Sequence, residues 1–306
     1  MRVAGRCQSR GRVCPLELRR QLLLAEISGG YRNHPVRQRW DSRQCGTRQA
    51  LSSTLWFFRC AAVMATMAEA LGVRSAVQMY RDWQGHIAAA LKNRFFNVAA
   101  GSLGSQGANT LALAFNVLPE EDARILTALV EDIRARGNHM NVGVMGVRFI
   151  LEVLTRRGEG DLALALMHQD TYPGFGHLIQ RGATTLWECW GEVEHDRKHG
   201  ARSLNHPFMG GYDNWYFNTL AGIRPDPANP GFKHIILEPH PIKGVAWVSC
   251  WHDCRQGRIE SNWRIEKDDF IWEIVITAGT TATATLPCGG APVALAAGQH
   301  KLSLKL

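Results

Sequence analysis

The spacing of apolar residues changes once along this chain of 306 residues, near the segment Arg224-Pro225-Asp226-Pro227. Before this segment apolar residues recur at every third or fourth position, which is the period of an α-helix. After it they recur at every second position, which is the period of a β-strand. The change predicts a helical domain over 51–222 followed by a β-rich domain over 223–306.

The helical part divides into segments that end at glycine or proline. Segment 107–118 is apolar on nearly every face, which predicts a buried inner helix, and its neighbours are amphipathic, which predicts outer helices. Such an alternation is typical of two concentric rings of helical hairpins. Seven helices are too few to close a double ring of twelve, so we expect a partial (α/α)6 barrel. The predicted helices are 52–71, 75–97, 107–118, 119–137, 145–157, 161–169 and 207–220.

The β-rich part contains at least six runs with strand periodicity. The run RIESNWRI places Ile259, Ser261 and Trp263 on one face, and the run DDFIWEIVIT does the same for Phe270 and Trp272. Six short strands are enough for a small antiparallel β-sandwich. The remaining predicted strands are 233–238, 245–254, 280–287 and 299–306.

The first 50 residues differ from the rest in composition. Residues 1–60 hold 12 Arg, no Lys and three acidic residues, whereas the remainder holds 23 basic and 24 acidic residues. Segment 1–50 is therefore interpreted either as the product of an out-of-frame or mis-started translation, or as a disordered basic leader or transit peptide. Because the body of the chain is neutral, no nucleic-acid partner is predicted.

Other composition features narrow the protein class. No uninterrupted apolar run approaches the roughly 18 residues of a membrane span, so no membrane partner is predicted. The spacings Cys250-x3-Cys254 and His195-x3-His199 lack a second pair of ligands, so neither a metal site nor a cofactor is predicted. Unpaired thiols and the lack of an ordered signal sequence favour a cytoplasmic location.

Chemistry is concentrated in the segment TYPGFGHLIQRGATTLWECW, residues 171–190. Here Glu188 lies between Trp187 and Trp190. Indole rings stack on the C–H faces of sugars, and a carboxylate between them suits proton transfer in a partly dry place. Each residue alone has a plainer interpretation: tryptophans are usually core residues, and a single Glu is usually a surface carboxylate. Together they favour a pocket at a barrel rim.

Two histidines occupy comparable positions. His206 in SLNHPF precedes the last predicted helix, and His139 in GNHMNVGVMG falls in a short loop between two helices. A lone His is usually a structural hydrogen-bonding residue. Polar groups at helix ends on one rim are nevertheless what a barrel of hairpins needs to form a pocket.

Several of these segments resemble bacterial inverting α-L-rhamnosidases of the six-hairpin type, glycoside hydrolase family 78. TYPGFGHLIQRGATTLWECW is similar to the family's segment that ends in GATTIWERW. SLNHPFMGGYDNWYFNTLAGIRPDPANPGFKHIILEPHP resembles its passage from the barrel into the C-terminal sandwich. GANTLALAFNVLPEE resembles its segment TQTAYALALAFGLLPEE, and NHMNVGVMGVRFILEVL resembles one of its helix starts. The resemblance covers about residues 51–280 in order.

The resemblance implies inverting hydrolysis of terminal α-L-rhamnosides, with a rhamnose-containing glycoside as the partner molecule. It assigns Glu188 as the general base and His206 as a sugar-binding residue. It makes Trp187 and Trp190 walls of the pocket and His139 a rim residue. No segment here resembles the one that carries the family's general acid, so we expect this chain alone to be an inactive part of the enzyme.

Two alternatives remain open. The chain is either a non-catalytic carbohydrate-binding or structural remnant, or a member of another six-hairpin glycosidase class. The continuity of the resemblance from Glu188 into the sandwich disfavours the second alternative.

Overall fold

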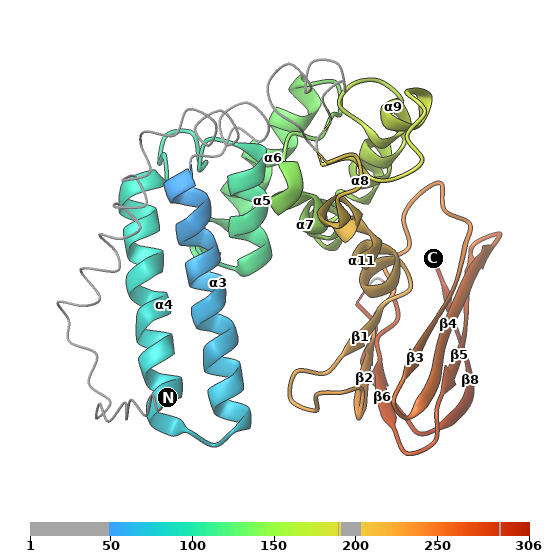
Figure 1. Ribbon diagram of the computed structural model, residues 1–306. Coiled ribbons are helices and arrows are strands. Elements are labelled where there is room, and N and C mark those ends of the chain that lie inside the picture. The colour runs from blue at the N-terminus through green and yellow to red at the C-terminus, as the bar shows by residue number, and fades with distance from the viewer. Residues whose placement is uncertain (1–48, 189, 191–202, 288) are drawn as a thin grey trace, which may run out of the picture.

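The computed structural model describes residues 49–188, 190, 203–287 and 289–306. It consists of a helical part followed by a sandwich of strands (Figure 1). The predicted leader 1–50, except for its last two residues, and the pair His195 and His199 lie outside the described residues.

The helical part begins with a long hairpin and continues with shorter helices around a common core (Figure 1). The hairpin consists of α3 (Gln49–Ala70) and α4 (Arg74–Phe95). The helices that follow are α5 (Gln106–Phe115), α6 (Asp122–Ala135), preceded by the 3-10 turn η2 (Pro119–Glu121), α7 (Gly143–Arg156), α8 (Gly160–Met167) and α9 (Phe175–Gln180).

Helix α5 confirms the prediction of a buried inner helix. Nine of its ten residues, all except Ala114, are buried. The side chain of Ser105 accepts a hydrogen bond from the amide of Ala108 at the start of the helix, and Asn116 ends it in the left-handed conformation. These two polar residues satisfy helix-end backbone groups that burial would otherwise leave unpaired.

The expected continuous helix at 207–220 is wrong in detail, and α9 was not expected. The chain there forms a 3-10 turn, η3 (Pro207–Tyr212), one short α-helical turn, α11 (Asp213–Trp215), and a π-helical turn, η4 (Tyr216–Leu220). Pro207 lacks an amide hydrogen, and Gly210 and Gly211 weaken helix propensity, so regular α-helix is disfavoured at this position. The indole of Trp215 fixes the segment by donating to the hydroxyl of Thr155 over 2.9 Å.

The C-terminal part is a sandwich of two four-stranded sheets. One sheet has the order β1-β2-β6-β7 and the other β3-β4-β5-β8. The sequence predicted a wholly antiparallel sandwich. Strands β2 and β6 run parallel, so one of the two sheets is mixed. Strands β1 and β7 were not expected because three residues are too few to show a period. The bounds are β1 (Ile223–Pro225), β2 (His234–Leu237), β3 (Trp247–Cys254), β4 (Gly257–Glu266), β5 (Asp269–Ile276), β6 (Thr281–Ala284), β7 (Val293–Leu295) and β8 (Gly298–Lys305).

The last helical turn is bonded directly to the sandwich core. The indole of Trp263 donates to the carbonyl of Leu220 over 2.7 Å, and the hydroxyl of Ser261 donates to that of Ala221 over 2.7 Å. The indole of Trp272 in turn donates to Ser261 over 2.9 Å. Buried indole N–H groups need acceptors, and here both acquire one at the junction between the two parts.

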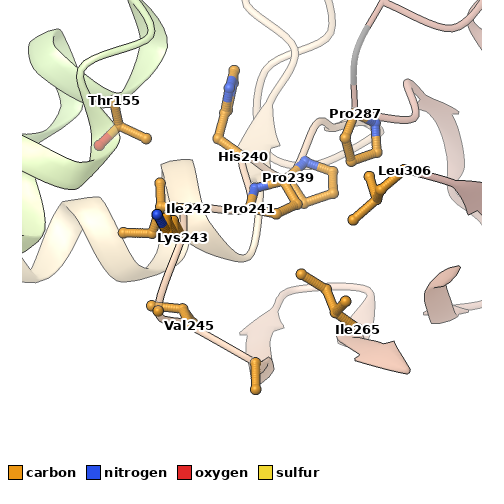
Figure 2. A pocket seen from close by; sticks show the side chains of 12 residues that line it. Thr155, Pro239, His240, Pro241, Ile242, Lys243, Val245, Ile265, Pro287 and Leu306 are labelled. Carbon is orange, nitrogen blue, oxygen red and sulfur yellow. The ribbon is translucent and has the colours of Figure 1, made fainter. Parts of the chain in front are cut away.

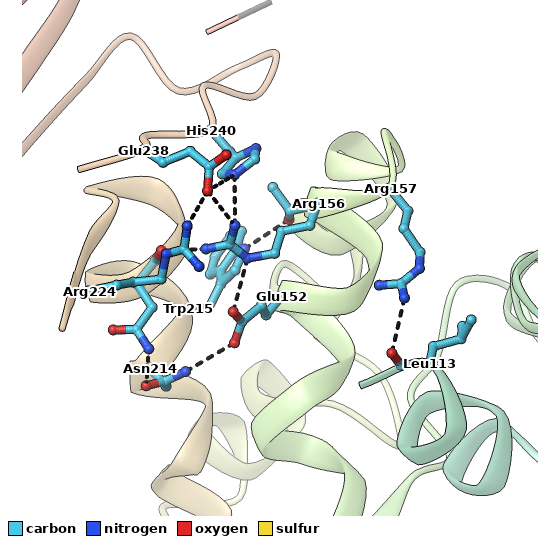
Figure 3. A network of polar contacts seen from close by, with 11 residues as sticks. Leu113, Glu152, Arg156, Arg157, Asn214, Trp215, Arg224, Glu238 and His240 are labelled. Atoms are coloured by element: carbon cyan, nitrogen blue, oxygen red, sulfur yellow. Dashed lines mark hydrogen bonds and ion pairs between the residues drawn. The ribbon is translucent and has the colours of Figure 1, made fainter. Parts of the chain in front are cut away.

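Arg156, at the end of α7, organises a polar network at the same junction (Figure 3). Its guanidinium contacts Glu152 and Glu238 at 3.0 Å each, and donates to the carbonyl of Asn218 over 2.8 Å. It also contacts Nε2 of His240 at 3.0 Å. Because Glu152 belongs to α7 and Glu238 follows β2, this one side chain joins the helical part to the sandwich.

Helix α3 requires a comment on the membrane prediction. By length and composition alone, the segment Ala50–Ala70 is long and apolar enough to cross a membrane. Within the protein, 33% of its most apolar stretch is buried. Leu51, Leu55 and Phe58 pack into the helical core. The segment was predicted as a helix and not as a possible membrane span, because polar residues interrupt its apolar runs.

Candidate functional site

Glu188 is positioned by two segments that lie side by side. The amide of Glu188 donates to the carbonyl of Ser203 over 3.0 Å, and the amide of His206 donates to the carbonyl of Leu186 over 2.8 Å. The hydroxyl of Thr185 also donates to the carbonyl of Leu204. These backbone bonds bring Glu188 and His206 together although 17 positions separate them in the sequence.

The Glu188 carboxylate has two different environments for its two oxygens. Oε2 accepts a hydrogen bond from the backbone amide of Ser203 at 3.1 Å. Oε1 lies 3.8 Å from Nε2 of His206, which is longer than a normal hydrogen bond. The side chains of Glu188 and His206 are 15% and 23% exposed, respectively. Ser203 therefore fixes one oxygen, and among the described residues the other oxygen has only the 3.8 Å contact with His206.

Glu188, Trp190, Ser203 and His206 are called the Glu188 group below. Two polar side-chain atoms of this group are buried without a hydrogen-bond partner in the described part of the chain. They are Nδ1 of His206 and Nε1 of Trp190. A buried unpaired polar atom costs about 1–3 kcal/mol, so such atoms need an explanation. Both atoms are shielded from solvent in the described structure, so a hydroxyl-bearing ligand would reach them only after neighbouring side chains move.

The two predicted tryptophans are more buried than expected of pocket walls. Trp187 is 7% and Trp190 5% exposed. Trp190 packs edge-on against Phe175 with ring centroids 4.9 Å apart, and Phe175 packs against Tyr212 at 4.6 Å. In this position they support the Glu188 segment from within the core. Their role as walls stays a prediction.

His139 lies between α6 and α7 as expected, but its ring is bonded elsewhere. Nδ1 is 2.8 Å from the carbonyl oxygen of Arg136, and Nε2 is 2.8 Å from the hydroxyl of Thr171. Both nitrogens are thus occupied, and a ligand would have to replace one of these contacts. The structure brings His139 to the start of segment 171–190 and gives it no bond to Glu188 among the described residues.

Two contributors escaped the sequence analysis. Ser203 acts through its backbone amide, which no sequence pattern reveals. Phe208 packs edge-on against His206 with centroids 5.0 Å apart, and it is 59% exposed. The sequence signal for Phe208 is its position two residues after His206, which places an aromatic residue beside a candidate sugar-binding histidine.

Two hollows lie away from Glu188. A groove of about 600 Å³ lies between the end of α7, the segment after β2 and the sandwich (Figure 2). A second hollow of about 410 Å³ includes Arg148, Asn214 and His252. Neither shares a lining residue with the Glu188 group. Their positions at the junction follow from imperfect packing where two parts of the chain meet.

The described residues contain no group of three or more His, Cys, Asp or Glu side chains arranged for a metal ion. The two thiols of the Cys250-x3-Cys254 spacing have different surroundings. Cys250 is buried, which raises the pKa of its thiol to about 11, and Cys254 donates to the carbonyl of Gly257 over 3.1 Å.

Two family models match the chain. The bacterial alpha-L-rhamnosidase 6 hairpin glycosidase domain matches residues 31–220, and the bacterial alpha-L-rhamnosidase C-terminal domain matches residues 222–301. The chain belongs to the bacterial α-L-rhamnosidase family. The first match begins inside the segment that composition had set apart as a leader. It places the helical part in a six-hairpin glycosidase domain, as the sequence had predicted.

Individual relatives and solved structures agree with this assignment. An alpha-L-rhamnosidase of Formosa agariphila is 32% identical over 79% of this chain, and one of Alteromonas sp. is 30% identical over 78%. Each match covers 26% of the relative, so the chain spans about a quarter of the length of these proteins. The structure of the Dictyoglumus thermophilum α-L-rhamnosidase is 26% identical, with a TM-score of 0.77 over 84% of this chain and 32% of that one. That of the Streptomyces avermitilis enzyme complexed with L-rhamnose is 25% identical, with a TM-score of 0.75 over 85% and 27%.

Proposed function

We propose that this chain provides the general-base side of an inverting α-L-rhamnosidase that acts on terminal α-L-rhamnosides, with Glu188 as the base. The observation that carries the proposal is the held carboxylate of Glu188. One oxygen is fixed by the Ser203 amide and the other is directed toward His206. The names of the relatives and the L-rhamnose complex of a similar structure supply the substrate class.

The chemistry follows from this geometry. A water molecule attacks the anomeric carbon of rhamnose, and Oε1 of Glu188, which has no hydrogen-bond partner among the described residues, accepts its proton. The bond from that carbon to the leaving oxygen breaks on the opposite face, and the leaving oxygen needs a proton from a second carboxyl group. In inverting glycosidases the two carboxyl groups stand about 6.5–9.5 Å apart to leave room for the water.

His206 and the aromatic residues would bind the sugar rather than transfer protons. Nδ1 of His206 has no partner in the described part of the chain and can bond a sugar hydroxyl. Phe208 beside it offers an exposed aromatic edge. Trp187 and Trp190 would hold the Glu188 segment in place through their packing.

We further propose that the general acid is not among the described residues. This proposal is supported by the sequence, in which no segment resembles the one that carries the family's general acid. General acid catalysis contributes typically about 10²–10⁴ in rate, so a chain without it would turn over ordinary rhamnosides very slowly.

The test separates the base from the acid by the choice of leaving group. Fluoride leaves α-L-rhamnosyl fluoride with little need of a proton, whereas the alcohol of an alkyl α-L-rhamnoside leaves only when protonated. The 306-residue chain is expected to release fluoride and to leave the alkyl rhamnoside intact. The product released first should be β-L-rhamnose, detected by proton NMR before the anomers equilibrate.

Glu188→Gln is the matched control because it keeps the shape of the side chain and removes the base. It should abolish fluoride release. Equal fluoride release by wild type and variant would contradict the base assignment. Hydrolysis of the alkyl rhamnoside would contradict the missing acid. Rhamnose binding without any hydrolysis would favour the non-catalytic binding alternative.

A further inference from the structure

Strand β3 carries two exposed tryptophans on one face. Trp247 is 67% and Trp251 52% exposed, whereas Cys250 on the opposite face is buried in the sandwich core. Both tryptophans therefore point away from the other sheet. They are four positions apart on the strand, so their Cα atoms are about 13 Å apart. Two large apolar side chains on one exposed face call for an explanation, because an indole that stays in water contributes none of the stabilisation that its burial would give.

The ring of Trp251 is held in a fixed orientation by a charged clamp. The guanidinium carbon of Arg258 lies 4.0 Å from the ring centroid. Asp253 fixes that guanidinium through two contacts of 2.8 and 3.1 Å. Since Trp251 is still 52% exposed, the clamp orients the ring and leaves much of it open.

Hydrogen-bonding side chains lie beside the two rings. Glu260 is directly opposite Trp251 on strand β4, and Asn262 is opposite Ser249. The hydroxyl of Ser249 donates to the amide oxygen of Asn262 over 2.8 Å. Ser249 separates the two indoles, so the surface alternates between aromatic and polar positions. A protein interface would instead favour a contiguous apolar centre.

The charges on this face neutralise one another. Arg258 is paired with Asp253, Arg264 with Glu266 and Glu273, and Lys301 also with Glu273. A surface whose cations already have carboxylate partners complements an uncharged ligand better than a strongly anionic or cationic one.

From these observations we infer that the outward face of β3 and β4 binds an extended, uncharged glycan chain, with sugar rings stacked on Trp247 and Trp251. Pyranose rings present C–H groups to an indole and hydroxyl groups to its polar neighbours, and this face supplies both kinds of partner. Positions 247 and 251 are farther apart than the width of one sugar ring, so the ligand that contacts both tryptophans is an oligosaccharide or polysaccharide. Such binding would retain the protein on a polymeric glycan, and it does not depend on hydrolysis at Glu188.

Affinity electrophoresis of the full chain tests the inference, with guar galactomannan and barley β-glucan as neutral probes and polygalacturonate as the charged comparison. High salt in the gel screens attraction by the N-terminal arginines. At least one neutral polysaccharide should slow the wild-type chain. Trp247→Ala and Trp251→Ala should each weaken binding about fivefold, and the double variant should abolish it. Ile179→Ala changes a residue on α9 that is 72% exposed, and it should bind as the wild type does.

Folding of the double variant is checked by its urea midpoint, which should not change because both side chains are exposed. The inference is overturned if neither neutral polysaccharide slows the wild-type chain, or if the double variant is slowed equally. It is also overturned if polygalacturonate is the only polysaccharide whose binding the double variant loses. A wild-type dimer that the double variant converts to a monomer would identify the face as a protein interface instead.

Discussion

The Glu188 group and the Arg156 network are both polar and both partly buried, yet they are paired to very different extents. Arg156 has four partners within 3.0 Å that come from both parts of the chain. At the Glu188 group the closest approach to His206 is 3.8 Å, and two buried polar atoms have no partner in the described residues. The junction is not perfect, since Nε of Arg224 is also unpaired. Buried unpaired atoms also occur at Trp56 and Thr219, so the informative difference is the partly bonded Glu188 carboxylate beside His206 against the fully paired guanidinium of Arg156.

The largest effect is expected at Glu188, the proposed base. Glu188→Gln should lower fluoride release from α-L-rhamnosyl fluoride by about 10²–10⁴, because water attack loses its proton acceptor. The thermal midpoint should stay within about 2 °C of the wild type, since Gln keeps the shape of the side chain and a carbonyl oxygen that can accept the hydrogen bond from the Ser203 amide. Kinetics and calorimetry on the same preparations check both parts. A fall in both activity and midpoint would mean that Glu188 is structural, as Arg156 is.

The junction should show the opposite pattern. Arg156→Ala leaves Glu152 and Glu238 without this partner and should lower the free energy of unfolding by about 1–3 kcal/mol, less than a fully buried pair because these side chains are partly exposed. Arg136→Ala removes an exposed ion pair with Asp132 on one helix and should cost less than about 0.5 kcal/mol. Urea denaturation measures both. Equal midpoints for the two variants would show that the Arg156 network is not stabilising.

His206 should affect ligand binding more than stability. His206→Ala is expected to weaken L-rhamnose binding about tenfold, the equivalent of about 1.4 kcal/mol for a lost hydrogen bond. Its unfolding midpoint should hardly change, because the side chain lacks strong partners in the described part of the chain. Isothermal titration provides the affinity. Unchanged affinity would remove His206 from the binding site.

The smallest effect concerns pH and lies at the junction. Burial, with the charge of Arg156 second, lowers the pKa of His240 below its ordinary value. The unfolded chain therefore takes up this proton first, and stability is lost as the pH falls below about 6.5. Glu238 acts with the same sign at lower pH. Burial raises its pKa, but the charges of Arg224 and Arg156 outweigh burial and lower it, so its contribution is lost as the pH falls below about 4.3.

His240→Gln isolates the histidine from the other titrating groups. Its urea midpoint should fall less than that of the wild type between pH 7.5 and 5.5. Parallel profiles of urea midpoint against pH for the two proteins would show that His240 does not cause the loss of stability at low pH.

The sequence was informative where periodicity or local chemistry decides structure. The buried α5 and the strands that carry Trp263 and Trp272 follow from their apolar patterns. The last helix was misjudged because Pro207, Gly210 and Gly211 act through local backbone preferences that the apolar pattern of 207–220 hides. The pairing of β2 with β6 joins residues 47 positions apart, such as His234 and Thr281, a long-range choice that no local pattern encodes.

The same limit explains what was found at the site. Trp-Glu-x-Trp and Asn-His are local motifs, so Glu188 and His206 could be named from the sequence. The role of Ser203 depends on its backbone amide, and the bonding of His139 depends on Thr171, which lies 32 residues away. Which polar atoms remain unpaired is decided by tertiary packing and could only be found in the structure.

One measurement tests the central contrast most directly, because the two indoles appear in the same spectrum. Nε1 of Trp190 has no partner in the described residues, whereas Nε1 of Trp263 donates to Leu220 at the junction. Titration of L-rhamnose into the ¹⁵N-labelled chain should shift the indole signal of Trp190 and leave that of Trp263 unchanged. A shift of Trp263 alone, or saturable binding that moves neither signal, would contradict the assignment of the ligand site to the Glu188 group.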